Sequence, residues 1–188
     1  MSSPTETNHI VIESEWTPNP NALKFILNRE VRPGDKVSFD SAEDAAAIPL
    51  AHDLFHLPYV RQVHFFENVI TVSKDEDPDW EKAKPEIEDI IRRLIPHHDP
   101  FFVPVKPNRR ASLSPELQKI EEILDRTIRP GLQGDGGDLE VVSLEGNKLS
   151  VHYQGACGSC PSSIGGTLQA IQGILQDEFN PDIQIEAL

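Results

Sequence analysis

Cysteine is scarce in this sequence. The 188 residues contain two, Cys157 and Cys160, which stand two residues apart in one motif. Secreted domains that depend on disulfides carry cysteines spaced along the chain, so this pattern argues against a disulfide framework. We therefore expect the protein to work in a reducing compartment, the cytosol. An organellar protein whose transit peptide had been removed would have the same composition.

Long hydrophobic runs and basic charge are also lacking. No stretch approaches the roughly 20 apolar residues of a membrane span, and the first nine residues are polar, unlike a secretion signal. Lys and Arg number 17 against 31 Asp and Glu, for a net charge of −14. After Pro115 there are four basic and twelve acidic residues. Neither half has the basic surplus that binds nucleic acid, so we expect no nucleic-acid and no membrane partner.

The chain does contain two segments with mixed strand and helix patterns. We predict an α+β protein of two small domains: a flexible tail over 1–9, an N-terminal mixed α/β sheet domain over 10–97, and a second domain over 115–188. Residues 98–114 between them include three prolines, which indicates an extended linker. Within it the apolar run Phe101-Phe102-Val103 is expected to dock on the first domain.

In the first domain, alternation and turn residues predict five strands and three helices. The strands are expected over 10–15, 22–27, 36–39, 60–66 and 69–74, and the helices over 41–47, 50–55 and 80–94. Arg32 to Asp35 reads as a turn. The last two strands form a hairpin in which Asn68 suits the left-handed conformation of a tight turn.

The second domain is predicted in the order helix, strand, strand, helix, strand. The expected ranges are 115–128, 139–145, 148–154, 161–175 and 183–187, with Ser114 as the cap of the first helix. The run Asp135-Gly136-Gly137-Asp138 lacks the spacing of a calcium loop and is predicted to be a tight turn. Gly165 and Gly166 lie inside a helix pattern, where close approach of a neighbouring backbone, from a partner subunit or from the same chain, would explain them.

The two thiols can hold one soft metal ion or close into a disulfide. Cys160 stands at a helix N-cap position and Pro161 at the first helical position, so amide N–H groups and the helix dipole favour thiolates. We expect this glycine-rich loop to be exposed, at the edge of the sheet. Zinc or an all-cysteine cluster needs four protein ligands, of which one chain offers two. Histidines or carboxylates of the same chain, or the same cysteines of a second chain, would complete the set.

Ordered motifs in both halves resemble the Nfu iron–sulfur proteins. The run Gly155-Ala156-Cys157-Gly158-Ser159-Cys160-Pro161, preceded by Arg129-Pro130 and the Asp135–Asp138 run, is similar to their NifU-like C-terminal domain. Thr17 to Phe25 and Asn68 to Val72 are similar to their N-terminal domain. The resemblance implies a carrier, not an enzyme, that forms a homodimer around a [4Fe-4S] cluster bound by Cys157 and Cys160. It further implies an upstream scaffold or donor and apo iron–sulfur client proteins as partners.

Two other interpretations of the motif stay open on the chemistry of the residues. A thiol–disulfide oxidoreductase also places a CxxC between a strand and a helix, although Ala156 stands where thioredoxins usually have Trp. Four thiolates shared by two chains would equally suit structural zinc. His52 and His56 have a spacing that can bind zinc, but we favour ordinary histidines because no third ligand is evident.

Overall fold

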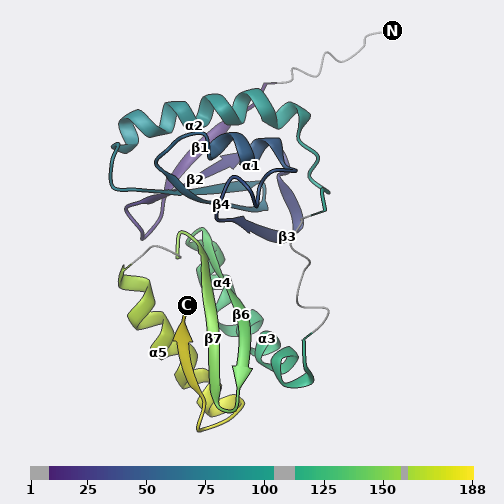
Figure 1. Cartoon of the computed structure of the whole chain (residues 1–188), viewed down its shortest axis with the longest axis vertical. Coiled ribbons are helices and arrows are strands. Elements are labelled where there is room, and N and C mark those ends of the chain that lie inside the picture. Colours follow the sequence, from purple (N-terminus) through teal and green to yellow (C-terminus); the bar gives the residue numbers. More distant parts are fainter. Residues whose placement is uncertain (1–8, 104–112, 158–160) are drawn as a thin grey trace.

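The structure, a computed structural model, describes residues 9–103, 113–157 and 161–188, without the side chains of 161–164. Two units, each with its own sheet and helices, lie one above the other in Figure 1, so the α+β class is confirmed. Within these ranges, no helix combines the length and the apolar character that crossing a bilayer requires.

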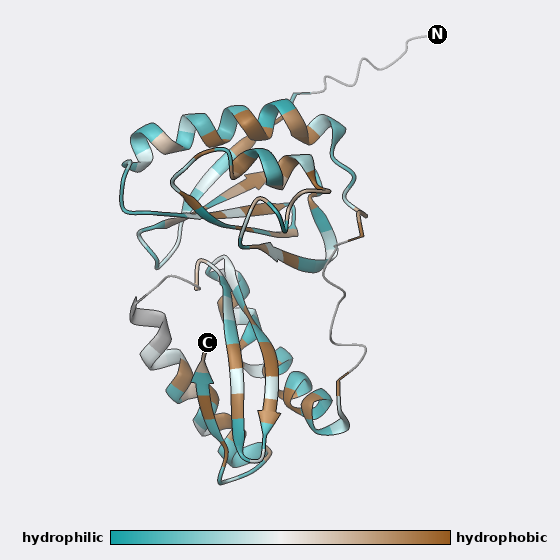
Figure 2. Cartoon of the chain, viewed as in Figure 1, coloured by the Kyte–Doolittle hydropathy of each residue, from teal (hydrophilic) through white to brown (hydrophobic). Residues whose placement is uncertain are grey.

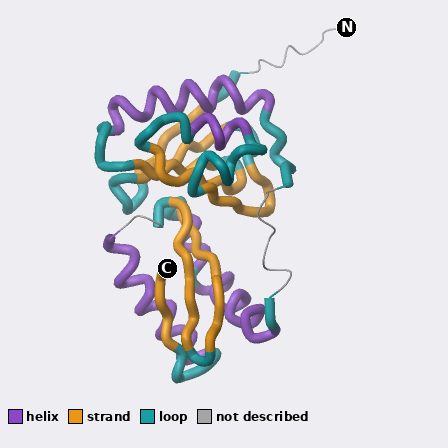
Figure 3. The backbone as a smooth tube through the Cα atoms, in the orientation of Figure 1, coloured by secondary structure: helices purple, strands orange, loops and turns teal. Residues whose placement is uncertain are grey.

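The first unit is a sheet of five antiparallel strands in the order β1-β2-β5-β4-β3. The strands are β1 (Ile12–Trp16), β2 (Ala22–Leu27), β3 (Arg32–Phe39), β4 (Val60–Glu67) and β5 (Val69–Lys74). The helices α1 (Pro49–Leu54) and α2 (Trp80–Leu94) cover one face, as Figures 1 and 3 show, and the short η1 (Ile95–His97) follows α2.

The first core lies between this sheet and its helices. Alternate residues of the strands point toward α2, whose inner face is apolar (Figure 2). Phe25, Phe65 and Ile87 are among its fully buried side chains. Phe102 joins this core at 9% exposure, as predicted, whereas Phe101 and Val103 are 70% and 86% exposed, so docking of the run is limited to one side chain.

Three local predictions for this domain are wrong. Residues 41–47 form turns, not a helix, because Ile48 precedes Pro49 and is held extended at φ −122° and ψ 91°. Residues 32–35 belong to β3, where a register shift between Arg32 and Lys36 absorbs the irregularity. In the hairpin, the positive φ of 52° falls on Glu67 instead of Asn68, whose side-chain amide donates to the carbonyl of Leu27 over 2.8 Å.

The second unit follows the predicted order with one added helix. Its elements are α3 (Pro115–Thr127), α4 (Arg129–Gly134), β6 (Gly137–Glu145), β7 (Lys148–Gly155), α5 (Pro161–Glu178) and β8 (Gln184–Ala187). Ser114 caps α3 by accepting the Leu117 amide at 3.3 Å, as predicted. The short α4 was missed because Pro130, which ends the apolar pattern of α3, restarts a helix in its first turn.

The second sheet has the order β6-β7-β8, with β7 antiparallel to β6 and parallel to β8. Its core contains Leu124, Leu139 and Ile171, all fully buried. The end of β7 lies against β4 and β5, on the face of the first sheet opposite α1 and α2 (Figure 1). This contact between the two units decides the surroundings of the cysteine motif.

Candidate functional site

Cys157 lies two residues beyond the end of β7 and is buried. Its exposure is 4%, and it belongs to the hydrophobic core of the second unit. Because β7 is the central strand, the loop leaves the middle of the sheet, not its edge. The predicted exposure and edge position are therefore wrong for Cys157. Cys160 lies outside the described residues, so the arrangement of the two thiols relative to each other stays a prediction.

The Asp135–Asp138 run forms the seat on which the cysteine loop rests. Asp135 and Gly136 make the predicted turn, with Gly136 at φ +79°, whereas Gly137 and Asp138 already belong to β6. The Gly136 carbonyl accepts a hydrogen bond from the Ala156 amide at 3.1 Å. A Cβ on Gly137 would come within 2.5 Å of the Cys157 Sγ atom. The sulfur therefore packs directly on the backbone of Gly137, and any larger residue there would displace it.

Asp138 is the buried charge beneath this seat. It is fully buried and accepts hydrogen bonds from Arg129 Nε at 3.1 Å and Gln133 Nε2 at 2.9 Å, and it pairs with Lys36 of the first unit. Burial alone would raise the pKa of Asp138. The charge and hydrogen bond of Lys36, with Gln133 and Arg129, outweigh burial and lower that pKa below its ordinary value. The motif residues Arg129 and Asp138 thus act structurally, as an ion pair inside the protein.

The first unit donates hydrogen bonds to the backbone on both sides of the seat. Asn19 Nδ2 donates to the Ala156 carbonyl at 2.8 Å, Ser73 Oγ to the Gly155 carbonyl at 3.2 Å, and Lys24 Nζ to the Gly134 carbonyl at 2.8 Å. Sequence reasoning missed all three donors. For Lys24 and Ser73 the available indication was their alternation with core residues on β2 and β5, which marks a polar second face but not what covers it. Asn19 lies in the turn between β1 and β2, where alternation gives no indication.

Two titratable side chains near the loop have displaced pKa values. Burial, together with the charge of Cys157, raises the pKa of Tyr153 to about 12. Its hydroxyl has no hydrogen-bond partner among the described residues. His64 is buried against the turn at Gly155, and burial lowers its pKa to about 4, although Asp138 opposes the shift and Lys36 adds to it. His152 is only half-buried and alternates along β7 with the buried Val151 and Tyr153.

His52 and His56 come together at the end of α1, far from the cysteine loop in the sequence. Their imidazole rings pack edge to face, with 4.8 Å between the ring centroids. Both Nδ1 atoms lie 3.6 Å from Oδ1 of Asp53. Asp53 is thus a third potential metal ligand that the sequence analysis overlooked. Its other oxygen pairs with Arg93 at 3.0 Å, however, so a cation there would compete with a guanidinium already in place.

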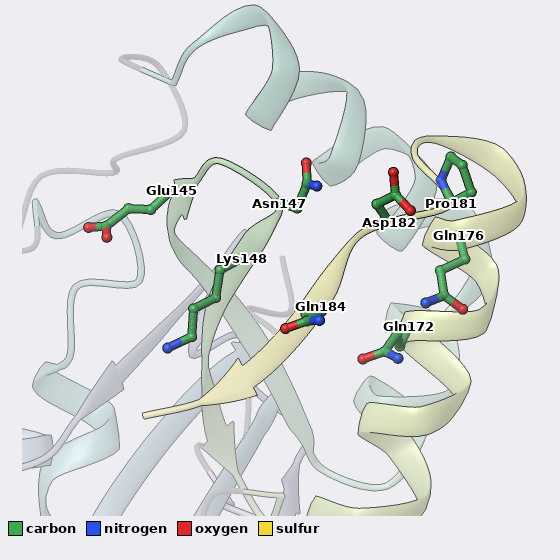
Figure 4. Close-up of a pocket in the computed structure, with 8 residues that line it drawn as sticks. All are labelled: Glu145, Asn147, Lys148, Gln172, Gln176, Pro181, Asp182 and Gln184. Atoms are coloured by element: carbon green, nitrogen blue, oxygen red, sulfur yellow. The ribbon is translucent and has the colours of Figure 1, made fainter.

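A polar pocket lies at the opposite end of β7 from Cys157 (Figure 4). Its amides bind the backbone of the chain itself: Gln176 donates to the Ile183 carbonyl at 3.2 Å, and Gln172 accepts from the Ile185 amide at 3.3 Å. Lys148 is paired with Glu186 at 2.7 Å. These contacts fasten β8 to the domain, so the pocket is explained by structure.

Comparison with known proteins covers both units. Residues 12–98 match the family described as scaffold protein Nfu/NifU N terminal, and residues 120–186 match the NifU-like domain. A Drosophila persimilis protein named "NFU1 iron-sulfur cluster scaffold homolog, mitochondrial" is 35% identical over 181 residues, which cover 94% of this chain and 64% of that protein. The Drosophila grimshawi protein of the same name is 37% identical, over 88% of this chain and 57% of its own.

The chain therefore spans somewhat more than half the length of these relatives. Among solved structures, the NMR structure of a NifU-like protein from Saccharomyces cerevisiae matches with a TM-score of 0.45 and 26% identity. That match covers 52% of this chain and 87% of the yeast one.

Proposed function

Because the chain belongs to the Nfu family, with a Nfu/NifU N-terminal scaffold domain followed by a NifU-like domain, we propose that it carries iron–sulfur clusters. Its cargo is a [4Fe-4S] cluster, and the ligands are Cys157 and Cys160. The observation that supports this assignment is that the only two cysteines of the chain both fall in the NifU-like region, two residues apart. Thiolates are the ligands that such clusters take from proteins.

The number of thiols leads to a homodimer. A [4Fe-4S] cluster held by cysteines alone takes four thiolates, and one chain supplies two. A two-fold axis through the cluster brings the same pair from a second copy without any new residue. Each subunit then keeps half of the ligands, and the site divides when the subunits separate.

A divided site suits transfer better than storage. Thiolates of an acceptor protein replace those of the carrier one at a time, so the cluster moves by ligand exchange. No covalent bond of a substrate is made or broken, and the protein acts as a carrier, not an enzyme. The partners in this proposal are apo iron–sulfur proteins as acceptors and an upstream scaffold as donor.

The compartment must be reducing for the thiolates to persist. The relatives are named mitochondrial, which agrees with the organellar alternative. The cytosol stays our prediction from composition. Imaging of a tagged protein in its own cells would decide between the two.

Two other functions use the same cysteines and are separated by one experiment. A thiol–disulfide oxidoreductase would need a disulfide between Cys157 and Cys160 to form and break, and a zinc site would need two chains but no iron. Anaerobic incubation with ferrous iron and sulfide, followed by metal analysis and light scattering after gel filtration, distinguishes all three. The carrier should take up about two iron ions per chain and become a dimer.

Cys157→Ser and Cys160→Ser should each abolish cluster retention while both domains stay folded by circular dichroism. Ser143→Ala, a comparably small change on β6 of the same unit, should retain the cluster and serves as the control. A cluster held by Cys157→Ser, or a full iron content in a monomer, would contradict the ligand assignment. A protein that stays colourless and rapidly reduces disulfides would favour the oxidoreductase.

A further inference from the structure

One face of the first sheet is polar and yet buried. Among the side chains that point away from α1 and α2, five polar ones form what we call the docking face: Lys24, Lys36, His64, Thr71 and Ser73. An antiparallel sheet with one apolar face commonly leaves its polar face in water. Here Lys24 is 9% exposed, and His64, Thr71 and Ser73 are 2% exposed or less. The end of β7 and the turn before β6 cover them.

Side chains of the docking face donate hydrogen bonds to backbone carbonyls of the second unit, in addition to the ion pair of Lys36 with Asp138. Ser73 and Lys24 donate to the Gly155 and Gly134 carbonyls, and Asn19, beside the face, donates to the Ala156 carbonyl. The hydrogen bonds of Asn19 and Ser73 are buried. A buried carbonyl that loses its donor keeps its full desolvation cost, so each bond opposes separation of the units.

Glycines make this close approach feasible. A Cβ on Gly136 would lie 2.7 Å from the Lys24 side chain and 3.1 Å from Thr71 Oγ1. A Cβ on Gly155 would meet the Gly136 carbonyl oxygen of its own unit at 2.5 Å first, and the His64 ring at 3.3 Å. The backbone at Gly136 is therefore shaped to fit this face, which is unexpected if the two units were merely tethered.

We propose that the docking face, together with Asn19, binds residues 155–157 and so holds the Cys157 thiol inside the second unit. The hydrogen bond of Asn19 matters most, because the Ala156 carbonyl that it binds belongs to the peptide bond leading into Cys157. The sulfur of Cys157 in turn packs on Gly137. While that peptide is fixed, the thiol stays inside the second unit. Turning it outward toward a second subunit requires the docking face to release the loop. That release of the docking face controls cluster loading rests on the proposed function. The contact between the docking face and residues 155–157 does not depend on it.

The contact is tested on the reduced apo protein, without any cluster. Alkylation of Cys157 by iodoacetamide is followed by peptide mass spectrometry in the intact chain and in the double variant Asn19→Ala, Ser73→Ala. Loss of two buried hydrogen bonds, each worth roughly threefold to tenfold, should accelerate the reaction about ten- to a hundredfold. The matched control, Asn180→Ala with Ser143→Ala near the opposite end of the second unit, should react like the unaltered chain. Equal rates in all three proteins would overturn the proposal.

Circular dichroism and thermal melting establish that each variant is folded. Should the double variant unfold, Lys24→Met replaces it, because it removes the ammonium that reaches the Gly134 carbonyl and keeps the aliphatic stem. A severalfold faster alkylation is expected for Lys24→Met. If Cys157 of the unaltered chain is alkylated rapidly, and the folded Lys24→Met variant is alkylated at the same rate, the docking face does not keep the Cys157 thiol inside the second unit.

Cluster loading separates this proposal from the proposed function. The double variant should acquire the iron–sulfur absorbance severalfold faster than the unaltered chain and reach the same iron content. If alkylation accelerates but loading does not, closure does not control the site and the proposal fails. If alkylation accelerates and no protein binds a cluster, the docking contact is supported and the carrier function is refuted.

Discussion

At the residue scale, Asp138 shows why two carboxylates of one motif have different roles. It is fully buried and pairs with Arg129 and Lys36, whereas Asp135, three residues earlier, is exposed. Arg129 is itself 3% exposed and also pairs with Glu121 at 2.6 Å. Removing one partner of such a group leaves charges buried without compensation, which costs more than the pair contributes when intact.

We predict that Asp138→Ala lowers the free energy of unfolding by about 3 kcal/mol or more. Asp135→Ala, the matched change at the exposed end of the motif, should stay within about 0.5 kcal/mol. Urea denaturation followed by circular dichroism measures both. Similar losses for the two variants would contradict a buried structural role specific to Asp138.

At the scale of the element, α5 carries glycines that its own chain does not explain. Gly165 and Gly166 are exposed, and apart from the backbone of α5 itself, no described atom lies within 4 Å of a Cβ built on either. Close packing against another element of the described structure, one form of our explanation from the same chain, is therefore not observed. Approach of a second subunit, one turn beyond the cysteine motif, is the explanation that stays a prediction.

The double variant Gly165→Ala, Gly166→Ala should accordingly have opposite effects on two states. The apo protein should be stabilised by about 1 kcal/mol per substitution, because alanine favours a helix and nothing occupies the added volume. The cluster-bound dimer should weaken, because the new methyl groups would meet the partner. Thermal melting reports the first effect and gel filtration of reconstituted protein the second.

Gly173→Ala is the control on the same helix, since a Cβ there also meets nothing within 4 Å in the described structure. It should stabilise the apo protein without affecting the dimer, because it lies two turns further from the cysteines. An unimpaired dimer in the double variant would remove α5 from the interface.

At the scale of the whole molecule, docking of the two units buries a histidine and so couples their contact to pH. His64 accepts or donates a hydrogen bond with Ser38 Oγ at 2.7 Å, and Lys36 and Asp138 are the charged groups that face it. Burial lowers its pKa from 6.5 to about 4. Unfolding, or separation of the units, returns the ring to water and its pKa toward the ordinary value.

We therefore predict that stability is full above about pH 6.5 and falls as pH decreases to about 4. In that window the unfolded imidazole takes a proton that the folded one does not, which costs on the order of 3 kcal/mol in total. Urea titrations at several pH values measure the loss, and His64→Gln should reduce it. His98, whose pKa burial also lowers, adds in the same direction and accounts for a residual slope. An identical pH profile in His64→Gln would contradict the assignment.

The sequence by itself determined the local structure and the chemistry of the ligands. Alternation and helical spacing predicted most elements, because each depends on which side of a strand or helix is apolar. The cysteine count followed from composition alone, and with it the need for a second source of ligands. Where local predictions failed, as at residues 41–47, a neighbouring proline outweighed a weak helix preference.

Only the tertiary structure decided how the two units meet and what surrounds Cys157. The polar residues of β2, β4 and β5 fit either a solvated face or a buried one, since periodicity places a side chain on a face without stating what lies opposite. The partners of Lys24 and Ser73 across this contact are backbone carbonyls, which every residue possesses and no sequence pattern marks. At Gly155, Ala156 and Cys157 the loop that the glycines predict to be exposed is therefore buried, and Gly155 lies close to His64 of the other unit.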